Sequence, residues 1–161
     1  MRDSLRHKLR GRLKSLWLTK QQRLLEILCA EYASEVQMEN LFRQHAQKMH
    51  YPHFRERLLR IAAAEERHAQ WLREKIFAFQ GTLPEVSLTE TTGKNTWECL
   101  LMELEEERCC VADLEDRLLK VETFNPEIAL GLRQIQREEK HHRDEIRDLL
   151  MRSDAYALWP E

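Results

Sequence analysis

Several features on which other classes of protein depend are scarce or absent in this sequence. It has only 4 Gly and 4 Pro among 161 residues, so few positions can break or sharply bend a helix. Its 4 Cys form no C-x-x-C pair, which argues against a disulfide framework or a zinc site. No apolar run approaches the ~18 residues that a membrane span needs, and the Arg-rich start lacks the uncharged apolar stretch of a secretory signal. We therefore expect one nearly all-helical (all-α) domain in the cytoplasm.

The charges are unevenly distributed, although the net charge is only −2. Residues 1–23 contain eight Lys or Arg and a single Asp, which gives this segment +7 and leaves −9 on the rest of the chain. Apolar residues recur there at helical spacing, namely Leu5, Leu9, Leu13, Leu16 and Trp17. We predict that residues 1–18 form an amphipathic helix that docks on protein, with peripheral contact to an anionic membrane as the alternative. Basic and aromatic residues are not interleaved as in a nucleic-acid channel, so no nucleic-acid partner is expected.

Start and stop signals divide residues 19–152 into four predicted helices, with a short tail over residues 153–161. Thr19 and Gln22 have the spacing of a capping box, so the first helix is expected to start near Lys20.

Proline, glycine and asparagine mark the limits of the other helices. Pro52 opens the second helix and Gly81 is placed to close it. Asn95 caps the third helix and Pro126 opens the fourth. The connection over residues 82–94 could span roughly 40 Å at ~3.3 Å per extended residue, which is the length of such a helix. We therefore predict a four-helix bundle, built as a duplicated helical hairpin with one long crossover.

Two Glu-x-x-His pairs, Glu65 with His68 and Glu139 with His142, interrupt apolar stripes of helical period. Each Glu lies thirteen residues after a helix-opening proline, as a duplicated hairpin predicts. The stripe residues are Phe54, Leu58, Ile61, Leu72 and Phe79 in the second helix, and Ile128, Leu132, Ile135, Ile146 and Leu149 in the fourth. A carboxylate left unpaired inside a bundle is costly, so something must neutralise these groups. We predict that a metal does so.

The register of the fourth helix has an alternative, because Glu138 and His141 have the same spacing. Only the Glu139 register keeps Leu132 and Ile135 seven and four residues upstream, as Leu58 and Ile61 stand before Glu65. We therefore favour Glu139 with His142.

The first and third helices each add one inward Glu. The predicted metal ligands are then Glu35, Glu65, His68, Glu107, Glu139 and His142. Oxygen-rich ligation with one imidazole per ion suits iron or manganese better than structural zinc. We expect two iron ions per chain, with manganese as the alternative. Further carboxylates crowd the same helices and are candidates for an additional ligand: Glu31, Glu39, Glu103 and Glu106.

Residues 20–152 carry the order Glu, Glu-x-x-His, crossover, Glu, Glu-x-x-His, which resembles the ferritin-like superfamily of di-iron carboxylate proteins, and within it the rubrerythrin-related branch. The resemblance implies that Glu65 and Glu139 bridge two irons, that Glu35 and Glu107 are terminal ligands, and that each His binds one iron. Rubrerythrins proper also carry a rubredoxin domain with paired C-x-x-C motifs, which this chain lacks. Electrons must then come from a separate donor or from ferrous iron itself.

The function expected from these residues and this resemblance is reduction of hydrogen peroxide or dioxygen at a di-iron site in a homo-oligomer, expected to be a dimer. No catalytic residue is assigned beyond the metal ligands. One alternative is a ferroxidase or iron-storage protein, which should assemble into a cage. The other is a metal-binding adaptor without turnover, recruited by its basic segment.

Overall fold

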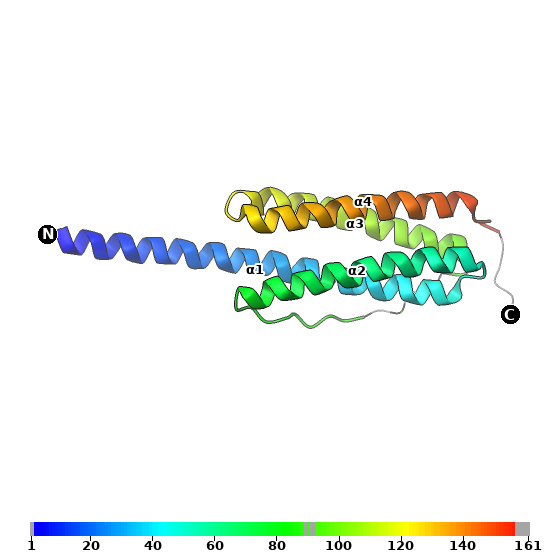
Figure 1. Ribbon diagram of the computed structural model, residues 1–161, viewed down its shortest axis with the longest axis horizontal. Helices are drawn as coiled ribbons and strands as arrows, with labels where there is room; N and C mark the ends of the chain where they lie inside the picture. Colours follow the sequence, from blue (N-terminus) through cyan, green and yellow to red (C-terminus); the bar gives the residue numbers. More distant parts are fainter. Residues whose placement is uncertain (1, 89, 91–92, 157–161) are drawn as a thin grey trace.

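Four long helices make up the protein in the computed structural model, which describes residues 2–88, 90 and 93–156, and only the backbone of residues 2–18. They are α1 (Arg2–Lys48), α2 (Pro52–Ala78), α3 (Thr96–Glu122) and α4 (Pro126–Arg152). Short turns join α1 to α2 and α3 to α4, and each of these pairs packs as an antiparallel hairpin (Figure 1). The all-helical bundle of two hairpins is the predicted fold. None of the described helices is long and apolar enough to cross a membrane.

The first helix begins earlier than expected. Thr19 and Gln22 predicted a start near Lys20, which is wrong, because α1 runs without a break from Arg2 to Lys48. No proline interrupts this stretch, and the single glycine in it, Gly11, costs a helix only about 1 kcal/mol relative to alanine. The early turns of α1 extend past the end of the bundle, away from the other helices (Figure 1). The amphipathic face predicted for residues 1–18 lies outside the side chains that the structure describes.

The end of α2 uses both a left-handed residue and a glycine, at neighbouring positions. Gln80 has φ 60°, and the Gly81 N–H donates to the carbonyl of Ile76 at 2.9 Å. This is the 6→1 bond of a Schellman motif, with Gln80 in the position that glycine usually takes. Gly81 also leaves room for a neighbouring side chain, because a Cβ there would lie 2.5 Å from Leu25 Cδ2.

Asparagine caps the second hairpin's helices as predicted. The Asn95 side chain accepts from the Glu98 N–H at 2.8 Å, and that of Asn125 accepts from the Ile128 N–H at 3.1 Å. Pro126 occupies the first turn of α4. These caps satisfy N–H groups that a helix cannot bond internally.

The connection between α2 and α3 runs along α1 for much of the bundle (Figure 1). The Gln21 amide donates to the Phe79 carbonyl at 3.0 Å, and the Gln37 amide donates to the Ser87 carbonyl at 3.5 Å. The contacts advance along both segments together, so the connection returns the chain to the other end of the bundle. The long crossover is therefore confirmed.

The core consists of two apolar clusters separated by a polar layer. One cluster includes Phe42, Leu58 and Leu149, and the other includes Leu28, Leu72 and Leu132. Buried Glu and His side chains occupy the stretch of each helix between the clusters. Burial of the two apolar ends, at about 25 cal/mol per Å² of apolar surface, therefore holds the helices around the polar layer.

A polar pair, His45 on α1 and Glu103 on α3, is completely buried. His45 Nδ1 lies 2.9 Å from Glu103 Oε1, and both side chains are 0% exposed. Burial raises the pKa of Glu103 well above its usual range, which favours the protonated carboxyl as donor to Nδ1. His45 Nε2 and Glu103 Oε2 have no hydrogen-bond partner within the described part of the chain. This pair links α1 to α3 inside the core.

Replacing one member of this pair should destabilise the fold more than replacing both. His45→Leu leaves the Glu103 carboxyl without a partner, and such a buried group costs about 1–3 kcal/mol. Glu103→Leu leaves His45 in the same position, whereas the double variant removes both polar groups. Urea unfolding of the four proteins measures the coupling. Losses that simply add in the double variant would show that the two side chains do not stabilise each other.

Candidate metal centre

Each helix places at least one ionisable side chain in the polar layer at the middle of the bundle. These are the six predicted ligands, which are between 0% and 6% exposed: Glu35 on α1, Glu65 and His68 on α2, Glu107 on α3, and Glu139 and His142 on α4. A Glu and a His three residues apart lie on the same helix face, which explains why both members of each pair point inward. In α4, Glu138 is partly exposed and His141 is exposed, so the inward face is that of the Glu139 register.

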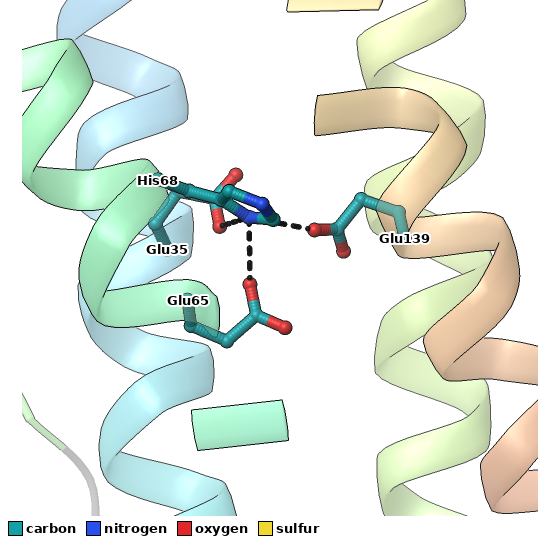
Figure 2. A group of neighbouring side chains, drawn as sticks. All are labelled: Glu35, Glu65, His68 and Glu139. Carbon is teal, nitrogen blue, oxygen red and sulfur yellow. Dashed lines mark hydrogen bonds and ion pairs between the residues drawn. The ribbon is translucent and has the colours of Figure 1, made fainter. Parts of the chain in front are cut away.

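The first group surrounds His68 with carboxylates from three helices (Figure 2). His68 Nδ1 lies 3.2 Å from Glu35 Oε2, 3.3 Å from Glu65 Oε2 and 3.1 Å from Glu139 Oε1. One ligand atom from each of these four residues falls within 4.8 Å of the others. A metal ion could therefore contact all four.

The second group surrounds His142 in the same way but less tightly. His142 Nδ1 lies 2.8 Å from Glu65 Oε1, 3.8 Å from Glu107 Oε1 and 3.9 Å from Glu139 Oε1. These four residues also offer ligand atoms within 4.8 Å of one another. Glu65 and Glu139 belong to both groups, so the two groups form one continuous cluster.

The imidazoles of the cluster are arranged as a pair. The His68 and His142 rings are nearly parallel, with 25° between their planes and 6.0 Å between their centroids. Each Nδ1 atom faces carboxylate oxygens. The cluster thus has one nitrogen donor in each half and two carboxylates, Glu65 and Glu139, common to both halves.

Most of the buried carboxylate oxygens in the cluster have no hydrogen-bond donor. Among the residues that the structure describes, no hydrogen-bond partner is found for either oxygen of Glu65, either oxygen of Glu107, Oε1 of Glu139 or His142 Nδ1. His142 Nδ1 is close to Glu65 Oε1, but the two atoms are not hydrogen-bonded. Buried polar atoms normally find partners, and leaving them unsatisfied costs about 1–3 kcal/mol each. The unused lone pairs converge on a common space, as a metal site requires.

The pKa values in the cluster are shifted by burial and by the charges of neighbouring carboxylates. Burial raises the pKa of Glu65 to about 7, and the charge of Glu139 acts in the same direction. Burial and Glu139 likewise raise the pKa values of Glu35 and Glu107 well above their usual range. Burial also opposes ionisation of Glu139, but the neighbouring His68 and Glu107 side chains outweigh it and lower its pKa.

The pKa values of the two histidines are shifted in opposite directions. Burial opposes a charge on His68, but the adjacent carboxylates of Glu139, Glu35 and Glu65 outweigh it and raise the pKa of His68. Burial dominates at His142, and the pKa of His142 is lowered. Four carboxyl groups share the interior with two imidazoles, so full ionisation requires additional positive charge.

The donor set fits iron or manganese. It has four carboxylates and two imidazoles for two ions, an oxygen-rich combination typical of these metals and unlike the Cys- and His-rich sites of structural zinc. The residues present therefore suit ions of this kind.

The other candidate carboxylates lie outside the two ligand groups. Arg117 Nη1 donates to Glu31 Oε1 at 2.5 Å, and Glu31 is nearly buried. Burial raises the pKa of Glu31 to about 7, although Arg117 acts in the opposite direction. Glu103 pairs with His45, and Glu39 accepts from Arg43 at 2.8 Å.

Two partners were missed in the sequence. His45 lies one turn before Met49 on the apolar side of α1, and no motif marks it. Glu138 was considered only as an alternative ligand, but its Oε2 lies 3.0 Å from His68 Nε2, on the far side of the ring from the cluster. Its position directly before Glu139 on a helix that faces α2 is the signal that could have identified this contact.

Comparison with known proteins supports the architecture. A ferritin-like, diiron-carboxylate protein from Bacillus anthracis is 23% identical, with 81% of this chain and 97% of that chain aligned and a TM-score of 0.71. The bacterioferritin of Desulfovibrio desulfuricans is 19% identical, with 83% and 81% aligned and a TM-score of 0.75. A dodecameric thioferritin from Bacteroides fragilis is 16% identical, with 81% and 86% aligned and a TM-score of 0.74.

Sequence comparison gives the family. No curated protein sequence matches the chain. The rubrerythrin family model matches residues 26–150, which include both hairpins and all six predicted ligands. With this match and the buried Glu and His cluster, the chain belongs to the rubrerythrin family of ferritin-like proteins.

Proposed function

We propose that this protein is a di-iron oxidoreductase that reduces hydrogen peroxide or dioxygen. The observation that carries the proposal is the single buried cluster in which Glu65 and Glu139 are common to two groups of ligands. Such sharing would hold two ions close together, and paired ions can deliver two electrons to one substrate molecule.

Each side chain has a distinct role in this proposal. Glu65 and Glu139 would be shared by the two ions, Glu35 and Glu107 would each hold one, and the histidines would bind through Nδ1, the nitrogen that faces the carboxylates. Burial of all six side chains keeps bulk water away from the ions. When bound, two ferrous ions would supply the two electrons that, together with two protons from the solvent, reduce one hydrogen peroxide molecule to two water molecules.

The cysteine content of the sequence bears on the electron donor. The sequence has no paired C-x-x-C motifs that could hold an electron-transfer iron, so a separate donor restores the ferrous state. All four cysteines are free thiols, which suits the reducing cytoplasm.

Iron storage is the second candidate function. It is supported by similarity in fold to a bacterioferritin and to a dodecameric thioferritin. A ferroxidase would oxidise ferrous iron with dioxygen and release the product to a cage. A third candidate, an adaptor without turnover, would bind metal stably and react with neither oxidant.

Stopped-flow mixing of the di-ferrous protein with each oxidant separates these functions. We expect about two irons per chain, faster oxidation by hydrogen peroxide than by dioxygen, and retention of iron afterwards. Faster oxidation by dioxygen with release of ferric iron would identify a ferroxidase instead.

Metal analysis of two variants tests the ligand assignment. Glu139→Ala should lose most of the bound iron because this side chain belongs to both groups, whereas Glu66→Ala on the exposed face should retain it.

The stability of the metal-free protein should fall as the pH rises from about 5 to about 8. Glu31, Glu35, Glu65 and Glu107 have raised pKa values, so the folded protein keeps protons that the unfolded chain releases. His68 acts in the same direction above its unfolded pKa. The lowered pKa of His142 opposes this trend at the acidic end of the range. Carboxyl groups with lowered pKa values are ionised in both the folded and the unfolded state above about pH 5, so they do not change the slope of stability with pH in this range.

Added metal should reverse this slope. Metal binds the deprotonated carboxylates, so its contribution to stability grows with pH. Thermal unfolding in a chelator and in excess Mn²⁺, at several pH values, gives both slopes. A chelated protein that becomes more stable towards pH 8 would contradict the assigned pKa directions.

We also propose that the basic segment, residues 1–18, packs on a second copy of the chain within a homo-oligomer, expected to be a dimer. The segment lies within residues 1–23, which carry a net charge of +7, whereas the rest of the chain carries −9. The opposite charges favour contact between the segment of one copy and the body of another. Deleting residues 1–18 should lower the oligomeric state, measured by light scattering, while the helix content of residues 19–152 persists. Salt-sensitive binding to anionic vesicles that disappears on deletion, with assembly unchanged, would indicate a membrane partner instead.

A further inference from the structure

The two halves of the metal centre differ at the residue directly before each bridging glutamate. In α4 this residue is Glu138, directly before Glu139. In α2 the corresponding residue is Ala64, directly before Glu65. The two hairpins otherwise supply equivalent ligands to the centre, so this position breaks the symmetry.

Glu138 holds the outer nitrogen of His68. Glu138 Oε2 lies 3.0 Å from His68 Nε2, while the Gln134 amide donates to Glu138 Oε1 at 3.2 Å. The carboxylate thus fixes the orientation of the ring and leaves Nδ1, on the opposite edge, directed at the cluster. A carboxylate behind a metal-binding histidine also makes the ring a stronger donor to the metal.

His142 has no equivalent support. Its ion pairs with Glu65, Glu107 and Glu139 all involve Nδ1, and no hydrogen bond or ion pair within the described part of the chain involves its Nε2. Ala64 and His142 line the same groove between α2 and α4, where the methyl group of Ala64 offers no acceptor.

The distances from each histidine to the surrounding carboxylate oxygens also distinguish the two halves. His68 Nδ1 has three carboxylate oxygens within 3.3 Å, whereas His142 Nδ1 has one at 2.8 Å and the next at 3.8 Å. The half around His68 is therefore the better organised of the two, by a measure independent of Glu138.

We propose that the two metal positions are inequivalent, with a tighter position at His68 and a weaker, more readily exchanged position at His142. This inference rests on the proposed binding of two ions. Loss of a supporting partner behind a metal-binding histidine typically costs 10–100-fold in affinity, and we expect a difference of about that size between the positions.

Anaerobic titration with Mn²⁺ against a competing chelator measures both affinities in the full-length protein. The parent protein should show two steps. His142→Ala should abolish the weaker step and His68→Ala the tighter one. Glu138→Ala should weaken the tighter step about 10–100-fold, and Ala64→Glu should strengthen the weaker step.

Matched controls exclude general effects of charge and folding. Glu66→Ala also removes a carboxylate next to a ligand, but Glu66 points to Arg43 on the surface and should leave both steps unchanged. Glu138→Gln keeps the side-chain volume and should give an intermediate loss. Thermal unfolding of each metal-free variant checks that it folds.

The outcomes distinguish this inference from the proposed function. Two ions that bind with equal affinity, and equal losses at both steps in Glu138→Ala, would overturn the inequivalence while leaving the di-metal centre intact. Failure of the parent protein to bind any metal would overturn both.

Discussion

Repulsion among four buried glutamates is the constraint on which the rest of this structure depends. Glu35, Glu65, Glu107 and Glu139 share one interior layer with only two imidazoles. The pKa values of Glu35, Glu65 and Glu107 are raised, and oxygens of Glu65, Glu107 and Glu139 lack a hydrogen-bond partner within the described residues, so the protein alone does not stabilise all four as carboxylates. A layer of this kind cannot hold four helices together. The apolar clusters above and below it must do so, and this explains why the bundle is long enough to have two separate apolar ends.

The hairpin duplication explains how such a layer is built economically. Each hairpin supplies one Glu from its first helix and a Glu-x-x-His from its second, and the crossover turns the second hairpin so that both sets meet at the same height. Exact equivalence is not required. Ala64 and Glu138 occupy corresponding positions, but one has a methyl group and the other a carboxylate. A symmetric set of ligands can therefore have different neighbours in its two halves. The centre can then hold one ion firmly and exchange the other.

Helical periodicity and cap residues were sufficient to predict most of the fold and the inward faces of the helices. Pro126 and Asn95 have local effects on the backbone, and the stripes through Glu65 and Glu139 repeat over many turns, so both are visible in sequence. The continuity of α1 was missed because a capping pair is weak when no breaker precedes it. The contact between His45 and Glu103 depends on how α1 and α3 are aligned, which no local pattern encodes. The proposed ligand roles likewise depend on ions that sequence periodicity cannot place.

The central claim is that metal ions provide the positive charge that the buried cluster lacks. Anomalous diffraction from crystals of the iron-loaded protein, recorded on both sides of the iron absorption edge, tests it most directly. The account predicts two iron peaks about 3.5–4 Å apart, between Glu65 and Glu139 and each next to one histidine. Iron found only at surface carboxylates, with the four buried glutamates bonded to one another through shared protons, would contradict it.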